Sequence, residues 1–350
     1  MNKEIQIGPY TISDHHKPFI IAEMSGNHNQ SLERALQIVD AAADAGAHAL
    51  KLQTYTADTI TFKGAYTIHD KNSLWDGKEL HDLYKLAYTP WEWHKAIFDH
   101  AKKKGMVAFS SPFDSTAVDF LETLNVPAYK IASFENTDHI LIKKVIQTGK
   151  PIIMSTGVAS ISDIQESLEI FNKYGCKNLI LLKCTSTYPA SPENTNLLTI
   201  PHMAKLYDCQ VGLSDHTMGI GASVAAVSFG ARIIEKHFTL SRAEGGVDSA
   251  FSLEPHELKA LVEESERAYL ALGKVNYTLS EKEKLSLTYK RSLYVVKDIK
   301  KGELYTAENV RSIRPSTGLH TRYYEEIIEG NKVASQDISA GTPLNWDLIK

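Results

Sequence analysis

The stretch Arg232-Ile233-Ile234-Glu235-Lys236-His237 joins a short apolar run to a strongly polar ending, and this design recurs along the chain. Seven earlier stretches share it: 19–23 (FIIAE), 49–53 (ALKLQ), 106–111 (MVAFSS), 128–133 (AYKIAS), 151–156 (PIIMST), 179–184 (LILLKC) and 211–216 (VGLSDH). Apolar runs of four to eight residues are typical of parallel strands that are buried on both faces. The sequence therefore predicts eight buried parallel strands.

Segments with helical periodicity lie between these runs, for example 31–45, 91–104, 115–124 and 161–174. Eight strands that alternate with helices over about 250 residues predict an α/β fold of the (β/α)8 TIM-barrel type. An open, doubly wound sheet is the second possibility. Its nucleotide-binding form is disfavoured because no G-x-G-x-x-G follows the first run.

The pattern changes near residue 273, which predicts three parts. We expect a barrel domain at 1–273, a polar linker at 274–290, and a compact domain of short strands and turns at 291–350. One further interval, 55–89, separates the second strand from its helix. Loops of this length are usually functional, and this one contains several aromatic and histidine residues, so we expect it to form a wall of the active site.

Charge and cysteine usage exclude several classes of function. The net charge of the 350 residues is −4, and there is no dense basic block, so nucleic acid is not the expected partner. The run Lys102 to Lys104 is instead typical of a helix C-terminus. Three cysteines without C-x-x-C spacing argue against disulfides and structural zinc. With no apolar run of membrane-spanning length, a cytoplasmic protein with no membrane partner is expected.

The active site of a TIM barrel lies at the C-terminal ends of its strands, where this chain concentrates polar side chains. Burying such groups is costly unless they pair or bind a ligand, so we interpret them together as a functional set. The candidates at or just after the strand ends are Glu23, Lys51, Gln53, Ser111, Lys130, Ser133, Glu135, Ser155, Ser186, Tyr188, Ser214, His216 and His237.

His216 and His237 end the last two strands, which are neighbours in a closed barrel. Two adjacent imidazoles suit a divalent metal with open positions for substrate, with Mn²⁺ favoured and Mg²⁺ or Co²⁺ as alternatives. A pair of hydrogen-bonded core histidines is the competing interpretation.

Lys51 and Lys130 point into the same closed space, and buried ammonium groups need an anionic partner. Residues 155–157 (STG) offer hydroxyls and backbone N–H groups for a phosphate, although a simple turn with a helix cap has the same pattern. A Schiff base on Lys130 is a further alternative.

Glu23 and Glu135 are candidates for the general acid and base, or else each only orients a lysine. Asp248 lies just after Gly245 and Gly246 in a flexible loop. It either forms hydrogen bonds with sugar hydroxyls or amides, or stabilises a turn.

A series of short motifs, taken in order along the chain, resembles those of the sialic acid synthase family, and the resemblance covers nearly the whole chain. The residues that carry the resemblance are Glu23 with 26–28 (GNH), 51–54 (KLQT), 110–113 (SSPF), 129–135 (YKIASFE), 153–157 (IMSTG), 184–189 (CTSTYP), 212–217 (GLSDHT) and 235–238 (EKHF). The tail, with Arg314-Pro315, resembles the antifreeze-like (SAF) domain of the same family.

The resemblance implies that phosphoenolpyruvate is condensed with an open-chain amino-sugar aldehyde held by a metal on His216 and His237. Glu23 and Glu135 are then the acid/base pair. The implied substrate contacts come from Gln53, Lys51, Lys130, Ser111, Ser133, Ser155, Ser186, Ser214, Tyr188, Asp248 and Arg314. Arg314 is implied to act in the partner's site of a domain-swapped homodimer.

Within the family, the segments 74–78, 88–93 and 248–253 look like the pseudaminic branch. Ser186 and Ser111 stand where the neuraminic branch commonly has Asn and Thr. The implied sugar is 2,4-diacetamido-2,4,6-trideoxy-β-L-altropyranose, which is less polar than N-acetylmannosamine. Phe251 and the aromatic residues of 66–75 are expected to supply the apolar pocket. Neuraminic or legionaminic acid synthesis remains an alternative, as does a non-enzymatic sugar-binding protein.

Overall fold

The computed structural model describes residues 1–71 and 75–350 and divides them into two compact units, Met1–Gly273 and Lys274–Lys350. The first unit is a closed barrel of parallel strands in the order β10-β3-β4-β5-β6-β7-β8-β9. The strands are β3 (Phe19–Glu23), β4 (Ala49–Thr54), β5 (Val107–Pro112), β6 (Tyr129–Ile131), β7 (Ile152–Ser155), β8 (Leu179–Cys184), β9 (Gln210–Asp215) and β10 (Ile233–His237). The predicted TIM barrel is confirmed, and closure of β10 onto β3 excludes the open sheet.

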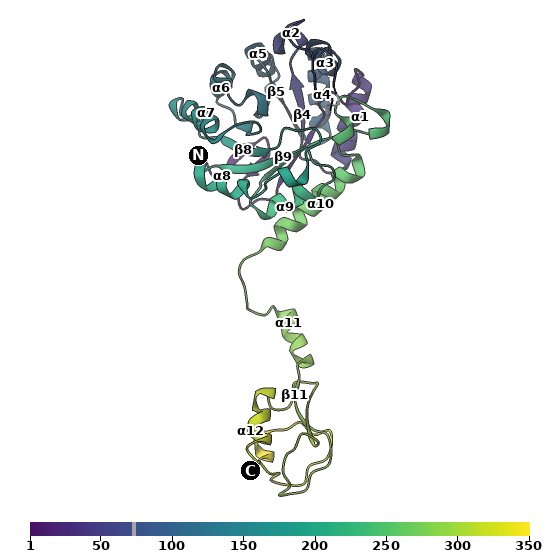
Figure 1. The fold of residues 1–350 in the computed structure, drawn as a ribbon, viewed down its shortest axis with the longest axis vertical. Coiled ribbons are helices and arrows are strands. Elements are labelled where there is room, and N and C mark those ends of the chain that lie inside the picture. The colour runs from purple at the N-terminus through teal and green to yellow at the C-terminus, as the bar shows by residue number, and fades with distance from the viewer. Residues whose placement is uncertain (72–74) are drawn as a thin grey trace. The chain divides into compact units, whose positions relative to one another are not determined.

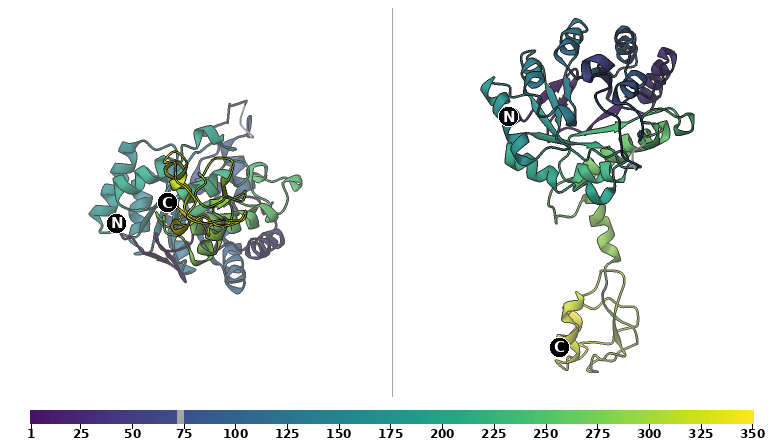
Figure 2. Two further views of the ribbon diagram at one scale, coloured as in Figure 1. Left: turned by 90° about the horizontal axis from the view of Figure 1, so that it is seen from below. Right: turned by 45° about the horizontal axis from the view of Figure 1, so that its top comes forward.

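Helices surround the barrel and cover the outward faces of its strands (Figures 1 and 2). They are α1 (Leu32–Asp44), α4 (Trp91–Lys103), α5 (Ser115–Thr123), α6 (His139–Ile146), α7 (Ile161–Lys173), α8 (Thr199–Tyr207), α9 (Gly221–Ser228) and α10 (Pro255–Leu272). Local signals start several of them: the side chains of Ser31, Asp114 and Ser160 each accept a backbone N–H in the first turn of the following helix. A short hairpin of β1 (Ile5–Ile7) and β2 (Tyr10–Ile12) precedes the barrel.

Two helices form in the described parts of the interval 55–89, which are residues 55–71 and 75–89. α2 (Ala57–Ile60) begins at a capping box in which Thr56 and Thr59 satisfy each other's backbone N–H groups. α3 (Leu80–Ala87) is amphipathic and buries Leu83 and Ala87 against the barrel mouth. Short helices of this kind give little periodic signal, so the sequence pattern did not predict them.

The second unit begins with a polar segment that contains α11 (Glu281–Leu285), and continues into a small domain. That domain pairs β11 (Ser292–Val295) with β12 (Val310–Ile313) and adds α12 (Tyr324–Ile328). Its own core includes Leu293, Val310 and Ile327.

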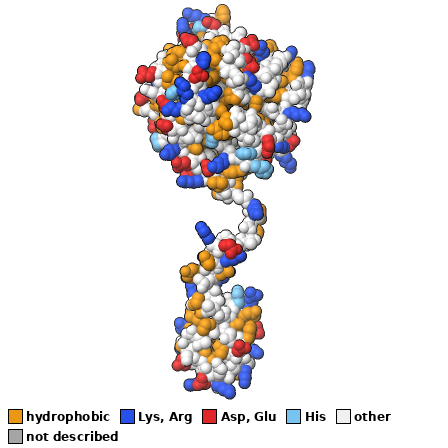
Figure 3. Space-filling view, turned by 180° about the vertical axis from the view of Figure 1, so that it is seen from behind, with side chains coloured by type: hydrophobic (Ala, Val, Ile, Leu, Met, Phe, Trp, Pro, Cys, Tyr) orange, Lys and Arg blue, Asp and Glu red, His pale blue; other side chains and the backbone are white. Residues whose placement is uncertain are grey.

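Positive and negative side chains are intermixed on the face of the barrel seen in Figure 3. This face therefore lacks the continuous basic stripe that characterises nucleic-acid-binding proteins. Among the described residues, no helix has both the length and the apolar character needed to cross a bilayer.

Candidate active site

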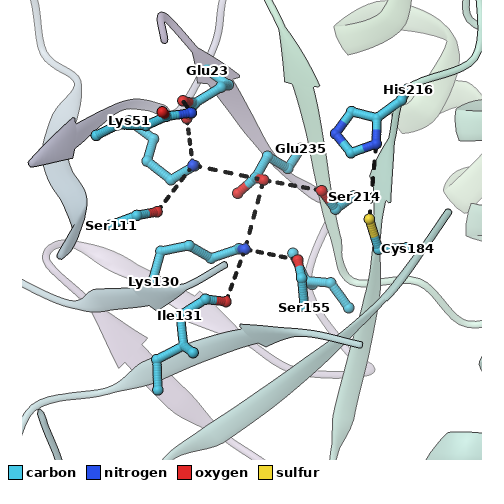
Figure 4. Close-up of polar contacts among 12 residues, drawn as sticks. Glu23, Lys51, Ser111, Lys130, Ile131, Ser155, Cys184, Ser214, His216 and Glu235 are labelled. Atoms are coloured by element: carbon cyan, nitrogen blue, oxygen red, sulfur yellow. Dashed lines mark hydrogen bonds and ion pairs between the residues drawn. The ribbon is translucent and has the colours of Figure 1, made fainter. Parts of the chain in front are cut away.

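Four charged side chains meet inside the mouth of the barrel and alternate in sign (Figure 4). The Lys51 ammonium lies 2.5 Å from Glu23 Oε2 and 3.8 Å from Glu235 Oε1. Lys130 lies 3.8 Å from the same Glu235 oxygen, so this carboxylate bridges the two lysines. All four side chains are almost fully buried. The cluster contains two ammonium groups and two carboxylates, and its formal charges cancel.

Burial and mutual attraction act against each other in this cluster. Burial would lower the pKa of Lys51, but Glu23 and Glu235 outweigh burial and raise the pKa above its usual value. Burial lowers the pKa of Lys130, and Glu235 opposes that shift. Burial would raise the pKa of Glu235, yet the two lysines hold it below its usual value. Glu235 therefore keeps its negative charge and favours the ammonium form of both lysines.

Serine hydroxyls surround the two ammonium groups. Lys130 donates to Ser155 Oγ at 2.7 Å, Lys51 donates to Ser111 Oγ at 3.2 Å, and Ser214 donates to Glu235 at 3.0 Å. Gln53 donates to Glu23 at 3.0 Å. These contacts fix the lysine ends, and Ser155 and Ser111, which accept hydrogen bonds from the lysines, keep their hydroxyl protons available for an anion.

The loop after β7 presents a third group of polar atoms beside Lys130. A Cβ at Gly157 would collide with the Oγ atoms of Ser133 and Ser186, so only glycine lets the backbone approach both hydroxyls. The next residue, Val158, has φ +55°, which a β-branched residue rarely adopts. Such strain is typical of functional loops, and here it accompanies a cradle of two hydroxyls and a backbone segment.

His216 and His237 face each other, with their ring centroids 5.3 Å apart. His216 Nδ1 lies 3.0 Å from the Thr185 carbonyl, and donation to that oxygen leaves Nε2 as the nitrogen with a lone pair. His237 Nδ1 is buried without a hydrogen-bond partner and lies 3.7 Å from Asp248 Oδ2. Tyr188 packs on His216 at 4.5 Å, and Ser25 donates a short hydrogen bond to Asp248.

This donor set fits a divalent metal that keeps most of its positions for water and substrate. Burial, followed by the proximity of His216, holds the pKa of His237 well below its usual value, so the ring is the neutral form that metals bind. An unpartnered buried imidazole nitrogen also needs an explanation, and a metal ion provides one. Among the described residues, no group of three or more His, Cys, Asp or Glu side chains is arranged to hold a metal.

Glu135 lies at the end of a single 3₁₀ turn, Ser133–Glu135, that directly follows β6. Burial raises the pKa of its carboxyl to about 7. Its Oε2 atom is buried without a hydrogen-bond partner. At neutral pH this carboxyl is therefore divided between its two protonation states, as a general acid or base requires.

A pocket of about 370 Å³ opens over these groups. Its reacting side includes Gln53, Ser133, Ser186, Tyr188, His237 and Asp248. Its opposite side is apolar and comes from Tyr55, Ile68, Leu80, Leu83, Tyr84 and Phe113. The apolar wall therefore differs from the one expected, which was to consist of Phe251 and the aromatic residues of 66–75. Tyr66 is exposed and does not line the pocket, and Phe251 is buried behind Tyr188. Trp75 does line the pocket, and residues 72–74, which include Leu74 of the segment 74–78, lie outside the described residues.

The structure brings together every candidate that the sequence analysis placed in the barrel. Arg314 belongs to the second unit, where it is exposed just after β12. Glu235 belongs to the polar ending of the run 232–237, but the sequence analysis assigned it no role in the site. Alternation along β10 could have revealed it, because Glu235 lies two residues before His237 and must share its inward face. Lys236, between them, points outward and pairs with Asp215 at 3.2 Å.

The fold and the charged site define a TIM-barrel protein with an appended SAF domain. The family model described as "NeuB family" matches residues 38–277, and the SAF domain model matches residues 290–350. The chain belongs to the NeuB family.

Named relatives extend this similarity over the full length. The chain is 45% identical to the pseudaminic acid synthase of Campylobacter jejuni subsp. jejuni serotype O:2, across 97% of this chain and 98% of the relative. It is 42% identical to the pseudaminic acid synthase of Helicobacter pylori, across 95% and 98%. The crystal structure of the N-acetylneuraminic acid (sialic acid) synthetase from Leptospira borgpetersenii serovar Hardjo-bovis in complex with citrate matches with TM-score 0.73 and 34% identity, covering 83% of this chain and 96% of that one.

Proposed function

We propose that the chain is a pseudaminic acid synthase, which condenses phosphoenolpyruvate with 2,4-diacetamido-2,4,6-trideoxy-β-L-altropyranose to give pseudaminic acid and phosphate. The observation that supports this reaction is that two buried lysines, a serine cradle and two facing imidazoles lie together in one barrel mouth. The choice of branch is supported by 45% identity to a pseudaminic acid synthase over nearly the whole chain.

The lysines and serines suit a substrate that carries both a carboxylate and a phosphate. Lys130, Ser155, Ser133 and Ser186 surround the cradle at Gly157 and would bind the phosphate. Lys51 and Ser111 lie on the neighbouring strands and would hold the carboxylate. The bound enol would then be fixed with its C3 atom toward the imidazoles, which limits the approach of the second substrate to one direction.

The reaction forms one carbon–carbon bond and replaces the C2–O bond to phosphate with a C2–O bond to the oxygen of water. C3 of phosphoenolpyruvate attacks the aldehyde carbon of the open-chain sugar, water adds at C2, and the resulting tetrahedral intermediate expels phosphate. Glu135 is suited to move a proton at the water or at the leaving phosphate, because the pKa of its carboxyl is about 7. Glu23 is the second candidate, since burial raises the pKa of its carboxyl.

His216 and His237 would hold a divalent metal, with Mn²⁺ proposed and Mg²⁺ or Co²⁺ as alternatives. A bound ion of this kind supplies Lewis acidity to the aldehyde oxygen. Asp248 lies beside His237, and with Tyr188 it would orient the hydroxyl and amide groups of the sugar.

We also propose that the protein forms a homodimer in which Arg314 of one subunit completes the active site of the other. Large apolar side chains in the segment before the small domain support it: Val275, Tyr277, Leu285 and Tyr289 are 91%, 96%, 77% and 65% exposed. Apolar groups exposed to this extent commonly lie in interfaces. We also propose a cytoplasmic location, where reducing conditions would keep the three unpaired cysteines as thiols.

The test is phosphate release from phosphoenolpyruvate in the presence of Mn²⁺. Three sugars are compared: the altrose-configured diacetamido sugar, N-acetylmannosamine and the legionaminic acid precursor. Strong release with the first sugar alone is expected. Release with another sugar instead would assign the chain to a sister synthase, and release with none would overturn the use of phosphoenolpyruvate.

A metal-dependent reaction requires that His237→Ala and a strong chelator each abolish phosphate release. Circular dichroism of the variant should remain that of the unaltered protein, because His237 lies at the barrel mouth and does not belong to the hydrophobic core cluster. Full activity in chelator would overturn the metal and leave the Schiff-base alternative on Lys130, which borohydride trapping with substrate would detect.

A further inference from the structure

The apolar side of the pocket is built by a helix that the reaction itself does not require. α3 contributes Leu80, Leu83, Tyr84 and Ala87 to the pocket lining. None of these side chains contacts the lysines, the cradle at Gly157 or the two imidazoles through a hydrogen bond or an ion pair. A sugar that reacts beside the two imidazoles would therefore meet this helix with substituents away from the reacting carbon.

α3 is held firmly against the barrel. Gly26 lies so close to its last turn that a Cβ would come within 3.1 Å of the Ala87 carbonyl oxygen and 3.2 Å of Ala87 Cα. The Gln30 side chain donates to the carbonyls of Leu86 and Tyr88 at 3.0 and 2.7 Å. At the other end, His81 pairs with Asp58 at 2.9 Å. A surface anchored at both ends keeps its shape when a ligand arrives, so it can discriminate between ligands.

The wall has two chemical features besides its rigidity. Leu80 and Leu83 present aliphatic groups, and Tyr55 packs edge-on between Tyr84 and Phe113, at 5.4 and 5.1 Å. Burial raises the pKa of both tyrosines, so their hydroxyls stay protonated. Methyl groups are stabilised on such a surface, and an amide can bond to the phenol hydroxyls at its edge. A sugar hydroxyl pressed against the leucines would lose its bonds to water without replacement.

We propose that the α3 wall, formed by Leu80, Leu83 and Tyr84 together with Tyr55, selects the sugar by its remote substituents. It favours a deoxy carbon and an acylamino methyl group over a hydroxymethyl group. This inference rests on the proposed function. It assigns substrate choice to α3, and it assigns the chemistry to the barrel strands.

The experiment measures kcat/KM for the 6-deoxy diacetamido sugar and for N-acetylmannosamine, and takes their ratio. In Leu83→Gln, the ratio is expected to fall at least about tenfold, because a polar side chain of similar length removes the apolar contact and offers a partner to a hydroxyl. The KM for phosphoenolpyruvate should stay unchanged, since the lysines and the cradle are untouched. Leu86→Gln is the matched control: it lies one turn along the same helix, is 56% exposed and does not line this pocket.

Tyr84→Ser provides a second variant, because Tyr84 is only half-buried and the substitution leaves the core intact. A fall in the ratio in either folded variant, with the control unchanged, supports the wall. Equal losses for both sugars, or an unchanged ratio, in both variants would overturn it. Failure of the unaltered protein to release phosphate with any sugar would overturn the proposed function instead, so the two failures are distinguishable.

Discussion

Glu235 determines the charge state of the two lysines, because its carboxylate lies between them at 3.8 Å from each. Without it, two buried ammonium groups would repel each other, and the pKa of Lys130, already lowered by burial, would fall further. Glu235 is thus a positioning residue that acts through the lysines.

Replacing Glu235 with Gln should reduce kcat/KM for phosphoenolpyruvate by about 100-fold, equivalent to about 3 kcal/mol. The high-pH limb of the pH profile should also move to lower pH, because Lys130 would lose its proton earlier. Steady-state kinetics from pH 6 to 9 measures both effects. Glu263→Gln, on the exposed face of α10, is the control, and an unchanged limb in the Glu235 variant would contradict the assignment.

Glu135 offers a second test at this scale. Because the pKa of its carboxyl is about 7, the pH profile of kcat/KM should show an inflection near that pH. Glu135→Gln should remove the inflection and lower the rate by about 10²- to 10⁴-fold. The exposed Glu166→Gln on α7 should leave the profile intact. Retention of the inflection would assign it to another group, with Glu23 the next candidate.

The sequence could predict which residues enter the site but not how they pair. Polar endings on apolar runs located Lys51, Lys130 and the histidines, because strand ends converge in any barrel. The bridge at Glu235 depends on the side-chain directions of three strands at once. The close approach at Gly157 depends on two distant loops, so neither could be derived from one segment.

Among the elements, α4 and the turn between β3 and α1 each contain one buried neutral histidine, His94 and His28 respectively. His94 Nε2 forms a hydrogen bond with Thr54 Oγ1 at 2.8 Å, and His28 Nε2 forms one with Thr89 Oγ1 at 3.1 Å. Burial lowers the pKa of each ring to about 4. In the unfolded chain each imidazole has a pKa of about 6.5. Between that pH and about pH 4 the unfolded chain therefore binds protons that the folded protein does not bind.

The stability that these histidines contribute is therefore complete above pH 6.5 and is lost as the pH falls toward 4. Each should contribute about 2 kcal/mol of the loss in unfolding free energy between pH 7 and pH 5. Chemical denaturation at the two pH values measures this change. His94→Gln should reduce the difference, and the exposed His202→Gln should not. Equal unfolding free energies at both pH values would contradict the burial argument.

Elements with strong periodicity were predictable, and short ones were not. All eight barrel strands follow from buried apolar runs, because each must be covered on both faces. α2 and α3 were missed because four and eight residues span too few turns to display a period. α2 is stabilised by the local capping box of Thr56 and Thr59, which the search for periodicity did not use. α3 is stabilised by the contact of Ala87 with Gly26, which is a feature of tertiary structure.

At the scale of the whole molecule, the proposed exchange of small domains predicts complementation between two inactive variants. His237→Ala disables the barrel, and Arg314→Ala disables the small domain. If Arg314 acts on the partner's barrel, a mixed dimer contains one intact site. Refolding the two variants together should then restore up to about a quarter of the unaltered activity, by random pairing of subunits.

Mixing without exchange of subunits is the control for that experiment, and should restore nothing. Co-refolded variants that remain inactive, although native mass spectrometry shows mixed dimers, would contradict action in the partner's site. A monomer in solution would remove the proposed dimer altogether.

The alternating cluster of Glu23, Lys51, Glu235 and Lys130 has a consequence for how the protein discriminates among the small anions of a cell. Each lysine already has an internal counterion, so the site projects little long-range field into solvent. Because each ammonium group is already partly neutralised by a carboxylate, an anion binds strongly only if it contacts both lysines at once. Ions such as chloride should therefore compete poorly, and binding of the doubly anionic substrate should depend only weakly on ionic strength.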